Sequence, residues 1–374
     1  MRRTICAGVM LTASVLALQA AQSGGAGVPA FSADPMWPRL PASVTLGEIT
    51  SLTVDRQDHV LVLHRPRSLP EDQRTSAPAA VVEIDQNGNL VRSWGGPGAG
   101  FEWPEREHGI HADSRGFVWI TGNNCLERKL PGLKPLADDQ VLKFTAEGKF
   151  VKQIGRSNQS KGNRDTANLQ QPADLFFHAK TNEVFVADGY GNHRVIVYDA
   201  DSGAFKRMWG AYGNAPVDSF RCVGPIPGEP FPTEGRGPEQ FTIAHAIRIS
   251  NDGLVYLADS SARRVQVFTL DGKYVNEVFV RRREMGTPRG LAFSIDPEQK
   301  FLFVGSNHEV VILDRSTLEV VGAFGSMGPK LGQFTSVPGT PDPHYIAADS
   351  KGNIYTAGGS RVQKFVYKGL LIRQ

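Results

Sequence analysis

The stretch that decides the fold runs from residue 108 to residue 121 and reads HGIHADSRGFVWIT. Two short runs rich in apolar and β-branched residues flank the D-x-x-G sequence of residues 113–116, and this pattern predicts two antiparallel strands joined by a tight turn. Variants of the phrase recur along the chain, so that it occurs six times. The other copies are ITSLTVDRQDHVLVL (49–63), ADLFFHAKTNEVFVAD (173–188), HAIRISNDGLVYLAD (245–259), RGLAFSIDPEQKFLFVG (289–305) and HYIAADSKGNIYTAG (344–358).

A second pair of short strands follows each copy, as in VVEIDQNGNLVRSWGG (81–96) and RVQVFTLDGKYVNEVF (264–279). Each unit therefore contains four strands within roughly 40 to 50 residues, which is typical of a propeller blade and not of a helical solenoid. We predict an all-β protein, a six-bladed β-propeller that forms a single domain over residues 31–374. The sixth unit ends one strand short, and we expect the extended segment from Phe31 to Trp37 to supply the missing outer strand and close the ring.

Four longer insertions interrupt the repeats, near residues 66–80, 122–139, 211–238 and 327–340. In the usual strand order of a blade, the second-to-third connection and the connection to the next blade lie on the same face. All four insertions are therefore expected at one end of the ring, where a functional site would be built.

The composition limits the classes of function. The chain has 374 residues, 40% of them hydrophobic, with 40 Gly and 24 Pro, which is typical of a globular protein that is not a helical bundle. Its formal net charge is only +3, so no nucleic-acid partner is expected. We expect a monomer that takes a small peptide-like substrate or a peptide or protein ligand.

The N-terminal segment has the pattern of a secretory signal. Arg2 and Arg3 precede an apolar run from Ile5 to Leu18, and small residues follow it. We predict a signal peptide over residues 1–22 and export to the periplasm or the outside of the cell. No later segment reaches the roughly 20 apolar residues of a transmembrane helix, so no membrane span is expected.

The two cysteines of the mature chain lie in insertions on the same predicted face. Because an exported protein can form disulfides, we predict a bond between Cys125 and Cys222.

Histidine recurs at one position of the repeat. When the copies are aligned on their first strands, His108, His245 and His344 share this position in blades two, four and six, and the odd blades have Thr50, Asp174 and Arg289 there. Innermost strands line the central channel of a propeller, so the three imidazoles should converge on its axis about 120° apart. Three histidines with one open position are the ligand set of a catalytic zinc site. The alternative is that these histidines only form hydrogen bonds with water and backbone. The remaining histidines share no common position in the repeat, and we assign them no metal role.

Two further residues lie where inner strands end at the face of the ring that carries the four insertions, here called the decorated face. Arg65 has the chemistry to hold an oxyanion or carboxylate, or alternatively to form a salt bridge that links blades. Tyr190 has the chemistry of a general base if a nearby cation lowers its pKa, or alternatively of a hydrogen-bonded lid on the core.

Together these residues resemble the NHL-repeat six-bladed propellers, and among them the peptidyl-α-hydroxyglycine α-amidating lyases. The resemblance spans roughly residues 49–369 and implies that the three channel histidines bind zinc and that Arg65 and Tyr190 belong to the active site. Two positions depart from the family pattern. Ser260 stands where the family has a second arginine, and Tyr345 stands where it has an aspartate that helps to hold a structural calcium. The resemblance therefore does not carry over the substrate-carboxylate contact of that arginine or the structural calcium.

We therefore predict a zinc-dependent lyase that cleaves the C–N bond of a carbinolamide, such as a peptidyl-α-hydroxyglycine, to an amide and glyoxylate. The alternative is a non-catalytic, exported NHL-type propeller that binds a peptide, glycan or protein partner. A lactonase-type hydrolase fits less well, because such propellers hold calcium through Glu, Asp and Asn, and the aligned channel positions are rich in histidine.

Overall fold

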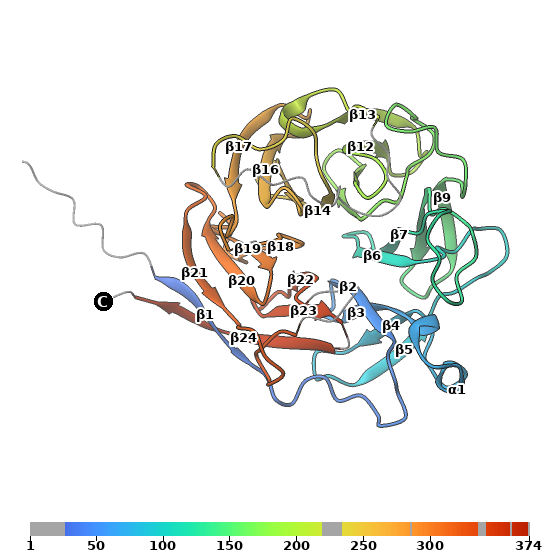
Figure 1. Ribbon diagram of the computed structural model, residues 1–374. Coiled ribbons are helices and arrows are strands. Elements are labelled where there is room, and N and C mark those ends of the chain that lie inside the picture. Colours follow the sequence, from blue (N-terminus) through green and yellow to red (C-terminus); the bar gives the residue numbers. More distant parts are fainter. Residues whose placement is uncertain (1–26, 219–233, 285, 336–341, 360, 373–374) are drawn as a thin grey trace, which may run out of the picture.

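The computed structural model describes residues 27–218, 234–284, 286–335, 342–359 and 361–372. In these ranges the chain forms six four-stranded antiparallel sheets that are arranged as blades around a central axis (Figure 1). The first strand of each blade lies next to the first strands of the neighbouring blades. The prediction of an all-β, six-bladed propeller is confirmed.

The blades follow one another along the chain, and each blade except the sixth uses consecutive strands. The first three blades comprise β2 (Glu48–Val54), β3 (Val60–Arg65), β4 (Val81–Ile84) and β5 (Leu90–Trp94); β6 (Glu107–Ala112), β7 (Phe117–Gly122), β8 (Gln140–Thr145) and β9 (Phe150–Gly155); and β10 (Asp174–His178), β11 (Glu183–Asp188), β12 (Arg194–Asp199) and β13 (Phe205–Trp209). The last three comprise β14 (Ala244–Ile249), β15 (Leu254–Asp259), β16 (Arg264–Thr269) and β17 (Tyr274–Phe279); β18 (Gly290–Phe293), β19 (Phe301–Ser306), β20 (Glu309–Asp314) and β21 (Val320–Phe324); and β22 (Tyr345–Ala348), β23 (Ile354–Gly358), β24 (Arg361–Leu371) and β1 (Val28–Ala33).

The two ends of the described chain meet in the sixth blade. β1 pairs antiparallel with β24, in a register that sets Phe31 opposite Tyr367 and Ala33 opposite Phe365 (Figure 1). The predicted closure is therefore present, but its bounds were wrong, because the strand is Val28–Ala33 and does not continue to Trp37. Pro35 has no N–H with which to extend the ladder, so the chain turns there.

The turns between strands follow the predicted chemistry. One carboxylate oxygen of Asp113 accepts hydrogen bonds from the backbone N–H groups of Arg115 and Phe117, each 2.9 Å long, and Gly116 takes the positive φ of +86° that the turn requires. Asp55 and Asp349 make the same pair of contacts in blades one and six.

The core lies between the blades. The second strand is buried along its whole length in blades one and three, whereas the outermost strands of these blades are exposed or half-buried up to their last residue, which is buried. Aromatic residues that end outer strands pack on the third strand of the next blade, as Trp94 does on Phe144 (5.4 Å between ring centroids) and Trp209 on Phe268 (6.0 Å). The blades are thus held together by large apolar contacts, and this leaves the channel free to carry polar groups.

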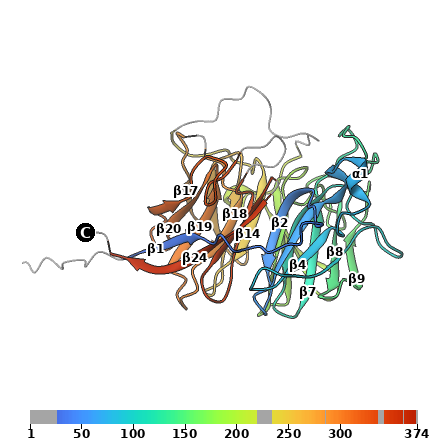
Figure 2. The same ribbon diagram turned by 90° about the horizontal axis from the view of Figure 1, so that it is seen from below.

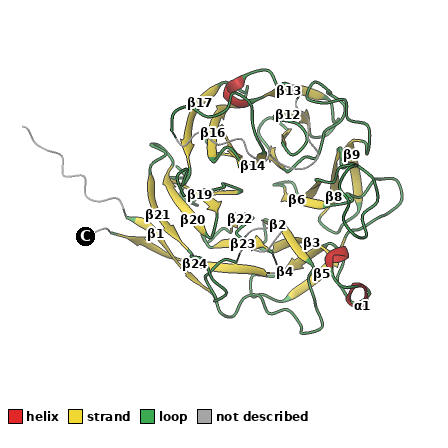
Figure 3. Cartoon of the chain, in the orientation of Figure 1, coloured by secondary structure: helices red, strands yellow, loops and turns green. Residues whose placement is uncertain are grey.

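Long connections gather at one end of the ring. The segment after β3 carries a 3-10 turn (Pro66–Ser68) and α1 (Glu71–Arg74), the segments after β7, β13 and β21 match the other predicted insertions, and a further one, residues 156–173 after β9, was not predicted. Figure 3 shows the helical turns on these peripheral loops, and Figure 2 shows α1 at one edge of the disc. Each of these segments joins a second to a third strand or one blade to the next, so their described parts begin and end on one face.

Some predictions concern residues beyond the described ranges. The predicted signal peptide, residues 1–22, lies outside them, as does Cys222. Cys125 is in a disulfide. None of the helices in the described ranges has the length and apolar character needed to cross a membrane.

Candidate metal centre

Local irregularities in the strands place the channel histidines. In β14 the register with β15 shifts between Ala244 and Ala246, and in β6 the register with β7 shifts between Glu107 and Ile110. His245 and His108 lie within these bulges, which redirect a side chain relative to a regular strand.

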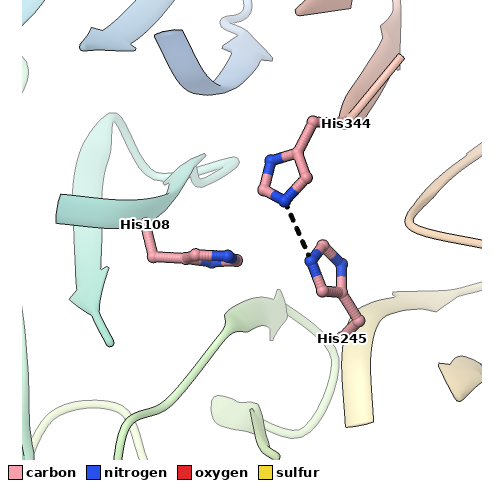
Figure 4. A group of neighbouring side chains, drawn as sticks. All are labelled: His108, His245 and His344. Atoms are coloured by element: carbon pink, nitrogen blue, oxygen red, sulfur yellow. Dashed lines mark hydrogen bonds between the residues drawn. The ribbon is translucent and has the colours of Figure 1, made fainter. Parts of the chain in front are cut away.

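His344 directly precedes β22, where its N–H donates to the carbonyl of Ala357 at 2.7 Å. The structure therefore brings together the three histidines that the sequence selected, and their rings point toward one another across the channel (Figure 4).

The three imidazoles lie close enough to share one ion. Their ring centroids are 5.1 Å apart for His108 and His245, 5.0 Å for His108 and His344, and 4.8 Å for His245 and His344. One ring nitrogen from each lies within 4.8 Å of the others, and Nε2 of His245 and Nε2 of His344 are 3.1 Å apart. Ligands of a tetrahedral zinc at about 2.0–2.1 Å lie about 3.3 Å from one another, so small movements of these rings would complete such a site.

The opposite nitrogen of each ring is fixed by the next blade. Nδ1 of His108 donates to the Ala173 carbonyl at 2.8 Å, Nδ1 of His245 to the Arg289 carbonyl at 2.8 Å, and Nδ1 of His344 to the Thr50 carbonyl at 2.6 Å. A carbonyl oxygen only accepts, so Nδ1 carries the proton and Nε2 of each neutral ring presents a lone pair to the axis. Hydrogen bonding of the distal nitrogen to a backbone carbonyl is the usual support for a metal-binding histidine.

The three channel histidines are unprotonated on Nε2 at neutral pH, so their lone pairs face one another. Burial lowers the pKa of His245 to about 3, and burial together with the neighbouring imidazoles lowers the pKa values of His108 and His344 well below 6.5. At neutral pH all three rings are therefore neutral, and two unprotonated nitrogens face each other at 3.1 Å. A cation satisfies both of them, so the residues present fit a zinc ion.

Tyr190 lies beside this cluster. Its hydroxyl is 3.0 Å from Nε2 of His108, and the two rings meet edge to face with centroids 4.8 Å apart. The turn that carries Tyr190 is anchored by buried Asp188, which accepts hydrogen bonds from Arg194 (2.9 Å) and Asn192 (2.8 Å). Gly189 packs so closely on blade four that a Cβ there would lie 2.1 Å from the Ala244 carbonyl oxygen. The tyrosine therefore has a fixed position next to the histidines.

Four arginines act on the Tyr190 hydroxyl. Burial raises the pKa of Tyr190, and the charges of these arginines oppose that shift. In decreasing order of effect they are Arg106, Arg289, Arg65 and Arg128. Only Arg65 was predicted, because Arg106 and Arg128 come from irregular loops. Arg289 occupies the same repeat position as the histidines, and that alignment was the signal that could have identified it.

Arg65 links the first two blades. Its Nη1 lies 2.7 Å from a carboxylate oxygen of Glu48, and its Nε and Nη2 donate to the Glu107 carbonyl at 2.9 and 2.6 Å. The alternative interpretation was a salt bridge between blades; here the salt bridge with Glu48 lies within blade one, and the link to blade two is made by the hydrogen bonds to the Glu107 carbonyl. Because Glu107 precedes His108, the same contact also holds the strand that carries a channel histidine.

A pocket of about 270 Å³ adjoins Arg65 on the decorated face. Arg65 and Arg106 line it together with Glu48, and an apolar wall comes from Leu130 and Leu133 in the insertion after β7. Its lining includes Glu107, which precedes His108 in β6, but none of the three channel histidines and not Tyr190. This space beside Arg65 has the mixed polar and apolar lining expected of a small-molecule or peptide site.

The two positions that depart from the family pattern have structural roles. The hydroxyl of fully buried Tyr345 lies within hydrogen-bonding distance of two carbonyl oxygens, those of Ala173 (3.0 Å) and His245 (3.2 Å). Ser260 is 4% exposed and lies in the turn after β15, where its N–H donates to the Ile243 carbonyl. Neither residue supplies a charge to the channel.

A second group of potential ligands in blade one is already engaged. Asp55, His59 and Glu83 lie close together, but Glu83 accepts from Arg92 at 2.6 Å and contacts His59 at 2.7 Å. One oxygen of Asp55 caps the turn that leads to His59. Hydrogen bonds and ion pairs within blade one therefore account for the grouping of these side chains.

The fold and the channel define the class of protein. The chain is a six-bladed β-propeller with NHL-type repeats and three inward-facing histidines on its axis. No model of a known protein family matches the chain. Among solved structures, a streptogramin B lyase matches with a TM-score of 0.50 and 11% identity over 90% of this chain and 98% of that one, a likeness of fold alone.

Curated relatives place the chain near two groups of proteins. It is 25% identical over 351 residues to NHL repeat-containing protein 3 of Homo sapiens, covering 90% of this chain and 84% of the relative. It is 25% identical over 370 residues to peptidyl-glycine alpha-amidating monooxygenase B of Xenopus laevis, and 24% identical over 242 residues to a probable peptidyl-alpha-hydroxyglycine alpha-amidating lyase of Caenorhabditis elegans. These matches cover 89% and 61% of this chain, but only 35% of the Xenopus protein and 57% of the nematode protein. The resemblance to NHL-repeat propellers and amidating lyases is confirmed.

Proposed function

We propose that the protein is a zinc-dependent lyase that cleaves the C–N bond of a carbinolamide, such as a peptidyl-α-hydroxyglycine, to an amide and glyoxylate. The observation that carries the proposal is the convergence of three imidazoles whose Nδ1 atoms are all committed to carbonyls and whose Nε2 lone pairs meet on the axis. Similarity to proteins named as amidating lyases and monooxygenases supports the reaction class.

His108, His245 and His344 would hold the metal. Zinc bound there supplies Lewis acidity, which lowers the pKa of a hydroxyl group that it binds. The three Nδ1 hydrogen bonds orient the rings and fix their tautomers before any ligand arrives, so only small movements of the rings would be needed to complete the site.

Tyr190 would move the proton. Its hydroxyl oxygen lies 3.0 Å from a histidine nitrogen, so a substrate hydroxyl in the centre would be within its reach. In the reaction, tyrosinate takes the substrate O–H proton, the O–H electron pair forms the C=O bond of glyoxylate, and the C–N electron pair leaves with nitrogen. Tyr190 then returns the proton to that nitrogen and completes the amide.

Arg65 would favour the ionised tyrosine, because its positive charge lowers the Tyr190 pKa. Its contact with the Glu107 carbonyl holds the strand of His108. The pocket of about 270 Å³ beside Arg65 would accept the peptide part of the substrate, with Leu130 and Leu133 against apolar atoms.

The direct test is product formation from α-hydroxyhippurate. Zinc-loaded protein should release equimolar benzamide and glyoxylate, and Tyr190→Phe should reduce the rate by about 10²- to 10⁴-fold, the usual contribution of a general base. Elemental analysis should find one zinc per chain in the wild type and none in a folded His245→Ala variant. Glyoxylate formation no faster in the wild type than in Tyr190→Phe would exclude the lyase.

The second candidate is a non-catalytic propeller that binds a peptide, glycan or protein partner. Ser260 favours it, because the structure has a buried serine where the resemblance implies an arginine. The similarity to NHL repeat-containing protein 3 over 90% of the chain is compatible with it as well. A folded protein that contains zinc but forms no glyoxylate would support this candidate.

We also propose that no structural calcium binds beside Tyr345. Calcium prefers six to eight oxygen ligands, including carboxylates. Here a phenol hydroxyl lies 3.0 and 3.2 Å from the two nearby carbonyl oxygens, and it supplies no negative charge. Elemental analysis of the same zinc-loaded sample should therefore find no calcium.

A further inference from the structure

Arg289 occupies the shared channel position in blade five, between the histidines of blades four and six. It directly precedes β18, and its carbonyl oxygen accepts the Nδ1 hydrogen bond of His245 at 2.8 Å. The backbone of Arg289 is therefore part of the support of the metal centre. Its side chain is partly buried.

The guanidinium of Arg289 has no acidic partner among the described residues, in contrast to five other arginines that are buried or line the channel face. Arg194, Arg264 and Arg248 pair with carboxylates at 2.9, 3.0 and 2.6 Å, in blades three and four. Arg65 and Arg106 both face Glu48, at 2.7 and 3.8 Å. Across the residues that the structure describes, no carboxylate of the chain forms an ion pair with Arg289.

One neutral group holds the Arg289 side chain. Its Nη1 donates to Oδ1 of Asn307 at 2.9 Å, just after β19, and the same oxygen accepts from the Thr287 hydroxyl. A guanidinium has five N–H donors, so this single bond fixes its direction and leaves capacity for a further acceptor. An uncompensated charge in a partly buried position is costly, which favours a ligand that neutralises it.

The position of Arg289 in the ring sets it beside the reacting groups. It lies at the channel position between His245 and His344, and its carbonyl oxygen accepts the Nδ1 hydrogen bond of His245 at 2.8 Å. It approaches from blade five, whereas Arg65 and Arg106 approach from blades one and two. An anion bound by Arg289 would therefore be held from a different blade than the one that carries the Glu48 carboxylate.

We propose that Arg289 binds the carboxylate of the substrate through charge-assisted hydrogen bonds and makes the site selective for ligands that end in a carboxylate. The proposal rests on the proposed function for the identity of the substrate but not for the existence of the anion site. Asn307 acts as a positioning residue, because it holds Arg289 without neutralising it.

The test compares two ligands of the same shape and different charge. Hippurate carries a carboxylate, and hippuramide replaces it with a neutral amide. Titration calorimetry or ligand-observed NMR with zinc-loaded protein should show that the wild type binds hippurate more tightly. Arg289→Gln should weaken hippurate binding by about 10- to 100-fold and change hippuramide binding by less than about twofold.

Two further variants separate charge from structure. Asn307→Asp keeps Arg289 but supplies a carboxylate beside it, so it should also reduce the preference for hippurate. Arg283→Gln is the matched control, since Arg283 is 75% exposed and its loss should leave both affinities unchanged. Zinc content and the thermal unfolding midpoint of each variant report whether the centre and the fold are intact.

The outcomes separate the two proposals. A wild type that does not prefer hippurate, or an Arg289→Gln variant that keeps the preference with its zinc content unchanged, would overturn the role of Arg289. A wild type that prefers hippurate but forms no glyoxylate from α-hydroxyhippurate would overturn the lyase and leave the anion site in place.

Discussion

Substitution of Gly109 by alanine tests how the channel histidine of blade two is supported. A Cβ at this position would lie 2.4 Å from the Ala173 carbonyl oxygen and 2.7 Å from the Thr121 hydroxyl oxygen, although real Cβ contacts are almost never shorter than 3.0 Å. The carbonyl must therefore move by at least about 0.6 Å, which exceeds the spread of normal N–H···O distances. That carbonyl accepts the Nδ1 hydrogen bond of His108, so the imidazole loses its orientation.

The expected loss is that of a supporting contact and not of a ligand. Disruption of such contacts typically weakens metal affinity 10- to 100-fold, which corresponds to about 1.4–2.7 kcal/mol. Zinc affinity measured by competition with a chelator should fall by that factor in Gly109→Ala. The matched control is Gly210→Ala, where the nearest atom to the new Cβ is 3.2 Å away and no channel histidine is involved. A Gly109→Ala protein that folds normally and binds zinc within twofold of the wild type would refute this account of the site.

Three further predictions concern stability. Burial lowers the pKa of His111 to about 3, so below pH 6.5 the unfolded chain gains a proton at this residue that the folded chain does not. Between pH 7.5 and 5.5 the wild type should therefore lose about 1.4 kcal/mol more unfolding free energy than His111→Leu, as measured by urea titration. Parallel pH profiles of the two proteins would contradict this. Phe31→Ala removes a ring that packs in the closing strand and should cost about 2 kcal/mol in the same assay, whereas a cost near zero would show that this packing is dispensable. Arg194→Met leaves the fully buried carboxylate of Asp188 unpaired and should cost about 3–5 kcal/mol, a result that a Tm equal to that of the wild type would exclude.

The sequence was most informative where one physical requirement repeats. The Asp-capped turn recurs because an antiparallel pair must reverse direction in every blade, and Asp113 and Asp349 make the same contacts. The alternation of histidine around the ring was visible for the same reason, since a shared repeat position is a shared place in the channel. Both the propeller and the meeting of three imidazoles follow from this periodicity.

Features that depend on single contacts were missed or misplaced. The closing strand begins at Val28 and ends before Pro35, a shift that only the pairing with β24 reveals. The insertion at residues 156–173 has no strand pattern, and it is held partly by bonds from buried Arg194 to the carbonyls of Asn163 and Asn168. The arginines around Tyr190 come from separate loops and blades, so their convergence could not be predicted from spacing.

The direction of the three Nδ1 hydrogen bonds has a mechanical consequence. They run from blade two to three, from four to five, and from six to one, so each crosses a different seam of the ring. An ion held by the three Nε2 atoms would connect these three interfaces through the imidazole rings, since each ring binds the ion on one side and the neighbouring blade on the other. Binding of one ion would then stabilise three of the six interfaces between blades, alternating around the ring.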